Sequence, residues 1–346
     1  MNAKKNTKEI TIDELAASLL AFRKPEKWKA IWQLTNTFIP YLFLWVVMVM
    51  MVKKGAPYWA TLIVTFLAAV LLIRIFIFFH DCCHGSFFAS RKANRVVGYL
   101  TGILAFTSYR NWRSAHLQHH ATYGNLDHRG AGDVWTLTVA EYYQLSRRMR
   151  LVYRLYRHPL IIFLIGPIYL FFVDQRFSPK NARKLIQRNV LFTNLGLLAI
   201  LIAAWFTIGI KTYLLIQVPL MIMGGIFGIW LFYIQHQFDG VYWARDEEFD
   251  MVKAALQGSS YYKLPRILHW LTGNIGFHHV HHIDPRIPNY QLQACYRDIP
   301  ALQQVEPLTI SQSLRSLNLH LWDEKGRQLI SFKTAAGLAR QGHLTV

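Results

Sequence analysis

Apolar residues in this chain are gathered in long uninterrupted runs. Four runs, over residues 32–52, 59–79, 190–210 and 213–235, are long enough to cross a bilayer, which takes about 20 helical residues. The first two runs are joined by "KKGAPY" and the last two by Lys211 and Thr212. Because these connections are so short, the pattern predicts two transmembrane helical hairpins in an all-α membrane protein.

Two further apolar runs, over residues 96–106 and 159–173, are shorter. Runs of this length are typical of segments that lie in the membrane interface or re-enter it without crossing. We therefore expect four spans, and we expect both short runs to return to the side on which they begin.

The distribution of Lys and Arg orients the hairpins, because positive residues accumulate on the cytoplasmic side. Residues 81–189 contain 16 of them, the first 31 residues contain seven, and the chain from 236 onward contains 11. The two hairpin loops contain Lys53, Lys54 and Lys211. The sequence thus predicts a multi-pass protein of the cell membrane whose termini and central segment face the cytoplasm.

These patterns divide the chain into five segments. We expect a cytoplasmic N-terminal segment with an amphipathic helix (1–31), a first hairpin (32–79), a cytoplasmic cap (80–189), a second hairpin (190–235) and a second part of the cap (236–346). Near the C-terminus, "LNLHLW", "DEKG" and "RQLISF" predict a β-hairpin in a small appendage.

Composition and motifs argue against a nucleic-acid-binding protein and against a disulfide-rich one. Of 346 residues, 53% are hydrophobic, yet 38 Lys and Arg face only 19 Asp and Glu. A basic chain can bind nucleic acid, a membrane surface or an acidic partner, but no segment resembles a nucleic-acid-binding module. Three cysteines without a CxxC motif do not predict a disulfide framework.

Histidines are grouped at the ends of the predicted spans and just beyond them. "HDCCH" places His80 and His84 on one helical face where the second span ends, and "YIQHQ" places His236 at the end of the fourth. Two segments share the pattern HxxHH: "HLQHH", with His116, His119 and His120, and "HHVHH", with His278, His281 and His282.

A single histidine is usually a surface or core residue, but nine on one predicted side of the membrane indicate metal binding. Imidazole suits zinc, copper, iron and nickel, and nine histidines are too many for one tetrahedral zinc. Two metals with four or five imidazoles each would use them all. Nitrogen ligands with an open position suit iron that reacts with O₂.

The order HxxxH, HxxHH, HxxHH resembles the membrane fatty acid desaturase family. The likeness extends to "HDCCHGSFF", "HHATYGNLDHRGAGDVWTLT", "GIWLFYIQHQF" and "LTGNIGFHHVHHIDPRIPNY", which are similar to bacterial acyl-lipid desaturases of the Δ5 and Δ12 type. It covers about residues 30–325. Cys83 stands where the resemblance leads us to expect glycine.

The resemblance implies two iron ions held by His80, His84, His116, His119, His120, His236, His278, His281 and His282. It further implies O₂ as co-substrate and a cis double bond placed in acyl chains of membrane phospholipids. Asp81, Asp127, Asp133 and Asn274 are candidates to orient the histidines through hydrogen bonds, with loop or capping bonds as the equal alternative.

The reaction also needs two electrons from outside the active site. Fused relatives contain a cytochrome b5 domain with His-Pro-Gly-Gly, whereas this chain has only His158 and Pro159 followed by leucine. We therefore expect a separate donor, a ferredoxin or flavodoxin-like protein whose acidic surface would be attracted by a basic cytoplasmic face.

Two other functions remain open at this level. The same histidine pattern is compatible with a hydroxylase or other monooxygenase on a related scaffold. A metal transporter or haem protein is a non-enzymatic alternative, although transport favours ligands at mid-membrane on the helices, and these histidines lie at the boundary.

Overall fold

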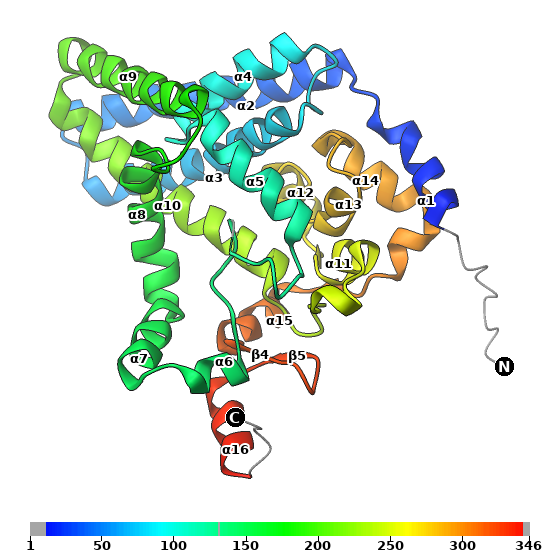
Figure 1. Cartoon of the computed structure of the whole chain (residues 1–346). Helices are drawn as coiled ribbons and strands as arrows, with labels where there is room; N and C mark the ends of the chain where they lie inside the picture. Colours follow the sequence, from blue (N-terminus) through cyan, green and yellow to red (C-terminus); the bar gives the residue numbers. More distant parts are fainter. Residues whose placement is uncertain (1–11, 131, 342–346) are drawn as a thin grey trace.

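A computed structural model describes residues 12–130 and 132–341 of the chain (Figure 1). The described residues are mostly helical, which confirms the predicted class. The α-helices are α1 (Ile12–Leu19), α2 (Lys27–Lys53), α3 (Tyr58–His84), α4 (Arg91–Leu104), α5 (Tyr109–Thr122), α6 (Val139–Gln144), α7 (Arg147–Tyr156), α8 (Gly166–Phe172), α9 (Lys184–Thr207), α10 (Ile210–His236), α11 (Met251–Gln257), α12 (Arg266–Leu271), α13 (His278–Ile283), α14 (Asn289–Asp298), α15 (Ile310–Arg315) and α16 (Phe332–Arg340).

Two small sheets accompany the helices. Strands β4 (Leu321–Asp323) and β5 (Gln328–Ile330) form the predicted antiparallel hairpin, and β1 (Leu137–Thr138) adds to β4 in parallel. Strands β2 (Tyr261–Tyr262) and β3 (Pro307–Leu308) pair separately. The three-stranded sheet therefore fastens the C-terminal appendage to the segment that follows α5.

Four helices, α2, α3, α9 and α10, are long and apolar enough to cross a membrane, as the four apolar runs predict. Helices α3 and α10 continue past their apolar runs as far as His84 and His236. The expected segment boundaries at 79/80 and 235/236 thus fall inside continuous helices. As a result, His80, His84 and His236 belong to the last turns of two spanning helices, and the helical backbone fixes their positions.

Helix α3 lies at the centre of the spanning helices. In its most apolar part 61% of the residues are buried within the protein, compared with 17% in α2 and in α9. The outer helices present exposed apolar side chains instead, among them Leu42 and Leu195, and exposed Trp28, Trp59 and Trp205 lie near helix ends. Exposed leucines along the shaft and tryptophans at the ends are what a bilayer stabilises.

The shorter apolar run at 96–106 belongs to α4, which lies against α3. A Cβ at Gly98 would approach Cys82 Cβ to 3.1 Å, and one at Gly102 would approach the Phe79 ring to 2.9 Å. Fourteen residues at about 1.5 Å each are too few to cross the membrane. The chain then turns at Phe106, whose φ is 53°, and α5 begins on the side where α3 ends.

The other short run forms the π-helical turn Ile161–Ile165 and α8. Together with α7, from which it is bent by 61°, this segment is long and apolar enough to be a broken span or a re-entrant segment. Helix α8 packs closely on α10, where a Cβ at Gly225 would approach Pro167 Cβ to 2.6 Å.

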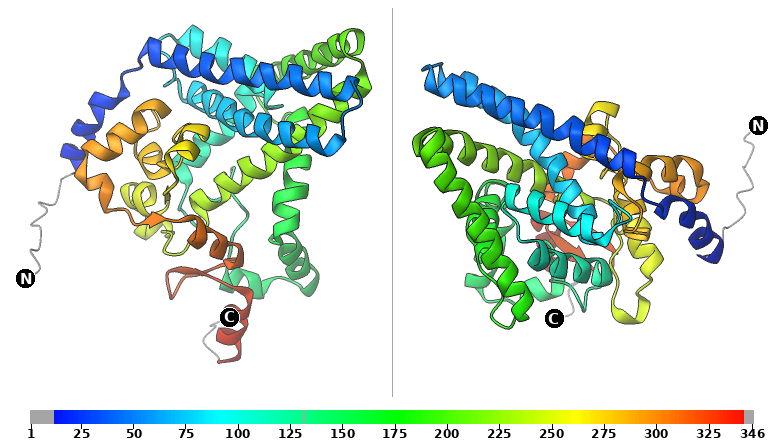
Figure 2. Two further views of the ribbon diagram at one scale, coloured as in Figure 1. Left: turned by 180° about the vertical axis from the view of Figure 1, so that it is seen from behind. Right: turned by 90° about the horizontal axis from the view of Figure 1, so that it is seen from above.

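The cap lies at the end of α3 and α10. Helices α1 and α11–α14 gather beside the spanning helices on one side of the molecule, and the β4–β5 hairpin with α16 forms a separate projection (Figures 1 and 2). Leu15 and Leu19 of α1 are buried against Phe277 and Val280, next to and within α13. The N-terminal helix is thus part of the cap core.

Arg74 is buried in the second half of α3 and is held by polar partners on two other elements. Its Nε donates to Thr37 Oγ1 at 2.9 Å, and Nη1 donates to the Trp270 carbonyl. The guanidinium carbon lies 4.4 Å from the centre of the Trp270 ring. The arginine therefore joins α2, α3 and α12 instead of extending to the membrane surface.

Candidate metal centre

The first two histidines lie in the last turn and a half of α3. His80 and His84 project from one face of this helix, with ring centres 4.8 Å apart. The helix ends at Gly85, whose φ of 76° is in the left-handed region and interrupts the helical hydrogen-bond pattern. The chain turns away directly after His84, so nothing of α3 covers the two imidazoles.

Helix α5 is fixed against the end of α3 by hydrogen bonds to backbone carbonyls in the last turn of α3. Tyr109 donates through its hydroxyl to the Cys82 carbonyl at 2.8 Å, and Arg113 Nε donates to the Cys83 carbonyl at 2.6 Å. These contacts direct His116, His119 and His120 of α5 toward the ends of α3 and α10.

Helix α13 and the last residue of α10 complete the set. The Tyr123 hydroxyl donates to the His236 carbonyl at 3.1 Å, and the Ser260 amide donates to the Gln235 carbonyl at 3.0 Å. The segment that follows Ser260 leads into α13, which carries His278, His281 and His282.

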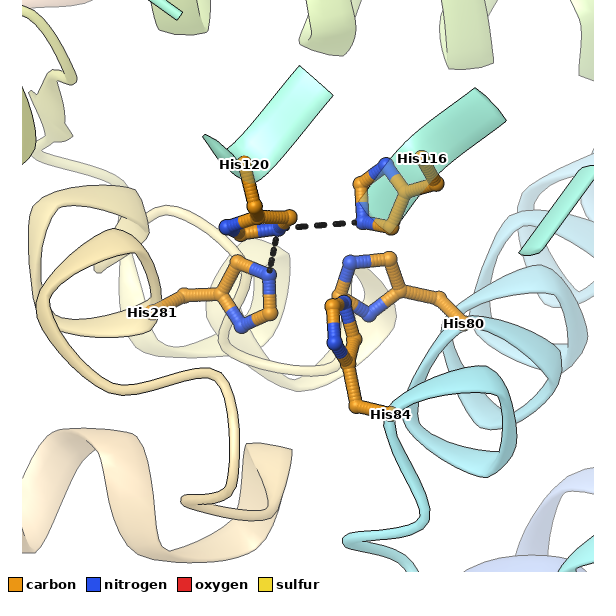
Figure 3. A group of neighbouring side chains, drawn as sticks. All are labelled: His80, His84, His116, His120 and His281. Atoms are coloured by element: carbon orange, nitrogen blue, oxygen red, sulfur yellow. Dashed lines mark hydrogen bonds between the residues drawn. The ribbon is translucent and has the colours of Figure 1, made fainter. Parts of the chain in front are cut away.

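Five histidines form the first group, shown in Figure 3. His80 and His84 come from α3, His116 and His120 from α5, and His281 from α13, and one nitrogen of each lies within 4.8 Å of the others. His120 Nε2 is 3.2 Å from His116 Nε2 and 3.0 Å from His281 Nε2. The nitrogens converge on a common centre, as the ligands of one metal ion do.

The remaining four histidines form a second group. Nitrogens of His119, His236 and His282 lie within 4.8 Å of one another. His236 Nε2 lies 3.1 Å from His119 Nε2 and 3.1 Å from His278 Nε2, which adds the fourth member. All nine predicted histidines are therefore brought together, as a group of five beside a group of four.

Five imidazoles outside the spanning helices are kept neutral. Burial, reinforced by neighbouring histidines, lowers the pKa of His116, His120, His278, His281 and His282 well below its ordinary value. A neutral imidazole keeps one nitrogen lone pair available to a metal.

The nitrogens present fit two metal ions. His84 Nε2 and His282 Nε2 are buried without a hydrogen-bond partner, although buried polar atoms are normally satisfied. Several other nitrogens face only nitrogens at about hydrogen-bond distance. Such an arrangement is costly without a cation, and one cation at the centre of each group would satisfy it.

His279, which interrupts the HxxHH pattern, points elsewhere. It is fully buried, and its Nε2 lies 3.1 Å from the Leu302 carbonyl, a partner outside both histidine groups. Burial lowers the pKa of His279 to about 4. This histidine belongs to the cap core.

Two of the four acidic or amide candidates contact a histidine. Asp81 Oδ1 lies 3.2 Å from His80 Nδ1, and Asp133 Oδ1 lies 2.5 Å from His119 Nδ1. A carboxylate at Nδ1 fixes the ring and leaves Nε2 for a metal. Asp127 instead bonds Arg245 Nη1 at 2.6 Å, and Asn274, with φ 59°, bonds the Asn289 carbonyl; both are loop contacts.

The sequence interpretation missed Asn289. This residue is fully buried, and its amide N–H and Nδ2 donate to Asp81 Oδ2 at 2.7 and 2.8 Å. Its own Oδ1 accepts from Gln33 Nε2 at 2.9 Å. Asn289 opens α14 seven residues after His282, inside the segment that resembles the desaturases, but its partner Asp81 lies 208 positions earlier in the chain, so no local spacing pattern indicated the contact.

Cys83 occupies the position where glycine was expected. Its side chain is buried, with Sγ 3.9 Å from the Tyr109 carbonyl. The thiol therefore fills space between α3 and α5 and does not point at the histidines.

A cavity of about 700 Å³ leads from the histidines toward the spanning helices. We call it the membrane-side cavity. His116 and His119 lie at its polar end, and Leu72 and Met221 lie where α3 and α10 are fully apolar. Trp112, which stacks on His116 with ring centres 4.2 Å apart, forms part of the wall. The shape and lining suit a long apolar chain.

The sequence and these elements match known proteins. Residues 56–312 match the family model described as fatty acid desaturase. The chain is 46% identical over 320 residues to a fatty acid desaturase of Bacillus subtilis (strain 168), covering 92% of this chain and 90% of that protein.

Plant relatives are more distant. The omega-6 fatty acid desaturase of Arabidopsis thaliana chloroplasts is 28% identical over 238 residues, or 65% of this chain and 50% of that protein. The sn-2 acyl-lipid omega-3 desaturase (ferredoxin) of the same organism is 28% identical over 235 residues, or 63% and 50%. This chain thus spans about half the length of these two plant enzymes. The family model and the bacterial relative cover most of the chain, and it belongs to the fatty acid desaturase family of O₂-dependent oxidoreductases.

Proposed function

We propose that this desaturase places a cis double bond in the acyl chains of intact membrane phospholipids, at two irons held by the nine histidines. The observation that carries the proposal is the meeting of both histidine groups with the apolar membrane-side cavity. When bound, the irons would supply the O₂-dependent oxidation that removes one hydrogen from each of two neighbouring methylenes.

The protein's part is to position the chain and to keep water away. Phe76, Trp112 and Phe232 surround the cavity near His116 and His119, so an acyl chain there would be held between aromatic side chains. Their bulk excludes water from the reacting methylenes. Asp133 holds the His119 ring in one orientation throughout.

The lipid-borne substrate follows from where the cavity opens. Tyr169 and Phe177 line it and are 59% and 68% exposed; Tyr169 lies on a segment that is apolar enough to lie in the membrane, and Phe177 follows its last residue. An acyl chain can therefore pass from the bilayer without a soluble carrier. The Arabidopsis relative named an acyl-lipid desaturase supports the same assignment.

Orientation and electron supply complete the proposal. The charge distribution supports a cytoplasmic cap in the cell membrane, with both termini on that side. Two electrons per turnover would come from a separate carrier, a ferredoxin or flavodoxin-like protein; the ferredoxin in the name of the Arabidopsis relative supports this class of donor. A net charge of +19 favours an acidic partner.

Lipid analysis tests the reaction. A host without such lipids that expresses this chain should accumulate intact phospholipid with a cis double bond at one fixed position, only in the presence of O₂. The His120→Ala variant should produce none. A hydroxylated chain carrying label from ¹⁸O₂ as the main product would instead support the monooxygenase alternative.

Metal content tests the site, with adjacent histidines as matched variants. The wild-type protein should contain iron near two per chain. His281→Ala removes a nitrogen from the group of five and should lose iron, whereas His279→Ala alters a core residue and should retain it. Zinc as the sole metal of active protein, or equal iron loss in both variants, would refute this assignment of ligands.

A further inference from the structure

A second cavity reaches the histidines from the opposite side of α5. It measures about 450 Å³, and we call it the cap-side cavity. His120 and His282 line it, so it touches one member of the group of five and one of the group of four. The membrane-side cavity is lined by His116 and His119 instead.

Helix α5 separates the two cavities. Ala115 and His116 line the membrane-side cavity, whereas Leu117, His120 and Ala121 line the cap-side cavity. Two faces of one helix therefore open in different directions. The far wall of the cap-side cavity is formed by Leu15, Ala16 and Leu19 of α1 and by residues of α11.

Burial shows which cavity brings solvent close to the histidines. Six of the nine are at most 8% exposed, and His84, His120 and His282 are the partly exposed ones. Two of these three line the cap-side cavity. At its mouth, Leu117 and Met251 are 38% and 64% exposed, so the cavity is open to the surface of the cap.

The walls of this cavity suit a small neutral molecule. Most of the described residues that line it are apolar, and the charged one, Arg23, is paired with Asp284. Apolar walls disfavour an ion, which would lose its hydration there, but admit a neutral gas.

A second entrance is needed if the proposed function holds, because the acyl chain and O₂ must be present together. The acyl chain would occupy the membrane-side cavity beside His116 and His119 and would itself obstruct that route to the histidines. We propose that the cap-side cavity is the passage by which O₂ reaches the metal centre and water leaves it.

Two alanines on α5 provide a matched test. Both are exposed, each precedes or follows a histidine directly, and each lines one cavity: Ala115 the membrane side and Ala121 the cap side. The probe is nitric oxide, a neutral diatomic molecule that binds ferrous iron and can be followed by stopped-flow absorbance on anaerobic reduced protein. Binding of a saturated phospholipid is measured in parallel.

Ala121→Phe should slow nitric oxide binding several-fold and raise the KM for O₂, with lipid binding and the double-bond position unchanged. Ala115→Phe should weaken lipid binding and leave the nitric oxide rate unchanged. Leu117→Ala, which widens the mouth of the cap-side cavity, should speed nitric oxide binding and tests the proposal even if Ala121→Phe does not fold.

Wild-type rates of nitric oxide binding in both Ala121→Phe and Leu117→Ala, or slowing by Ala115→Phe alone, would show that the cap-side cavity is not the passage for O₂. Absence of any nitric oxide signal in the wild-type protein would instead count against the proposed iron site.

Discussion

Asp127 and Asp133 stand on one loop after α5 but have unlike partners. Asp133 is nearly buried and lies 2.5 Å from His119 Nδ1, whereas Asp127 is paired with Arg245 at the surface. Asp127 stands between Leu126 and His128, and Asp133 between Gly132 and Val134, and neither pair of neighbours predicts a contact with a histidine of α5. At the scale of single residues, the two aspartates have different partners because the path of the loop brings Asp133, and not Asp127, next to α5.

Replacement of Asp133 by asparagine should therefore weaken metal binding. Loss of a carboxylate that orients a ligating histidine typically costs about 10–100-fold in metal affinity. Titration of the iron-loaded protein with a competing chelator measures this. Asp127→Asn is the control and should retain wild-type affinity, since its carboxylate touches no histidine. Equal loss in the two variants would show that loop stability, and not ring orientation, governs metal retention.

Helix α10 shows how one element serves both packing and binding. Its three glycines line the membrane-side cavity, but two have a packing reason: a Cβ at Gly224 would meet Leu72 Cδ2 at 3.3 Å, and one at Gly225 would meet Pro167 Cβ at 2.6 Å. Gly228 has nothing within 4 Å of the same position. A glycine inside a helix costs about 1 kcal/mol relative to alanine, so an absent side chain here leaves room in the cavity at a cost to the helix.

A leucine at Gly228 should project into the membrane-side cavity and shorten it. Gly228 lies two turns before His236, about 12 Å along the helix axis. We expect Gly228→Leu to shift the chain-length preference toward shorter acyl chains or to move the double bond, as measured by mass spectrometry of the products. Gly337→Leu, on α16 and also with open space around it, should leave the product unchanged. An unaltered profile in Gly228→Leu would mean that the acyl chain does not pass this position.

The whole molecule places the nine histidines of the two groups at the same end of its spanning helices. His80 and His84 end α3, His236 ends α10, and α5 and α13 meet them there. Helix α4 makes this possible because it lies beside α3 and does not cross. The described cysteines, Cys82, Cys83 and Cys295, are all buried, which leaves a low background for labelling introduced thiols.

Labelling with a membrane-impermeant maleimide should therefore report one orientation. Cysteines substituted for Lys54, exposed in the first hairpin loop, and for Lys211, exposed in the first turn of α10, should react in intact cells. A cysteine at His128, whose side chain is 58% exposed on the cap, should react only after the membrane is opened. Each variant must retain desaturase activity to count. Reaction at position 128 from outside would place the cap on the opposite side from the one the charges predict.

The sequence by itself determined the features that depend on neighbouring residues. Uninterrupted apolar runs fixed the four spans, short connections fixed the hairpins, and i, i+3, i+4 spacing fixed which histidines share a helix, because each of these depends only on local geometry. The β4–β5 hairpin followed from alternation around "DEKG".

Only the tertiary structure decided how the nine histidines divide. His119 and His120 are adjacent, as are His281 and His282, yet in each pair one residue joins the group of five and the other the group of four. Successive residues of a helix point about 100° apart, so neighbours must face different surroundings. Which surroundings they face depends on how α5 and α13 pack against α3 and α10. The tertiary structure likewise decides that Asn289 bonds to Asp81 and that a cavity opens on either side of α5. These contacts join residues far apart in the chain, and no local pattern encodes them.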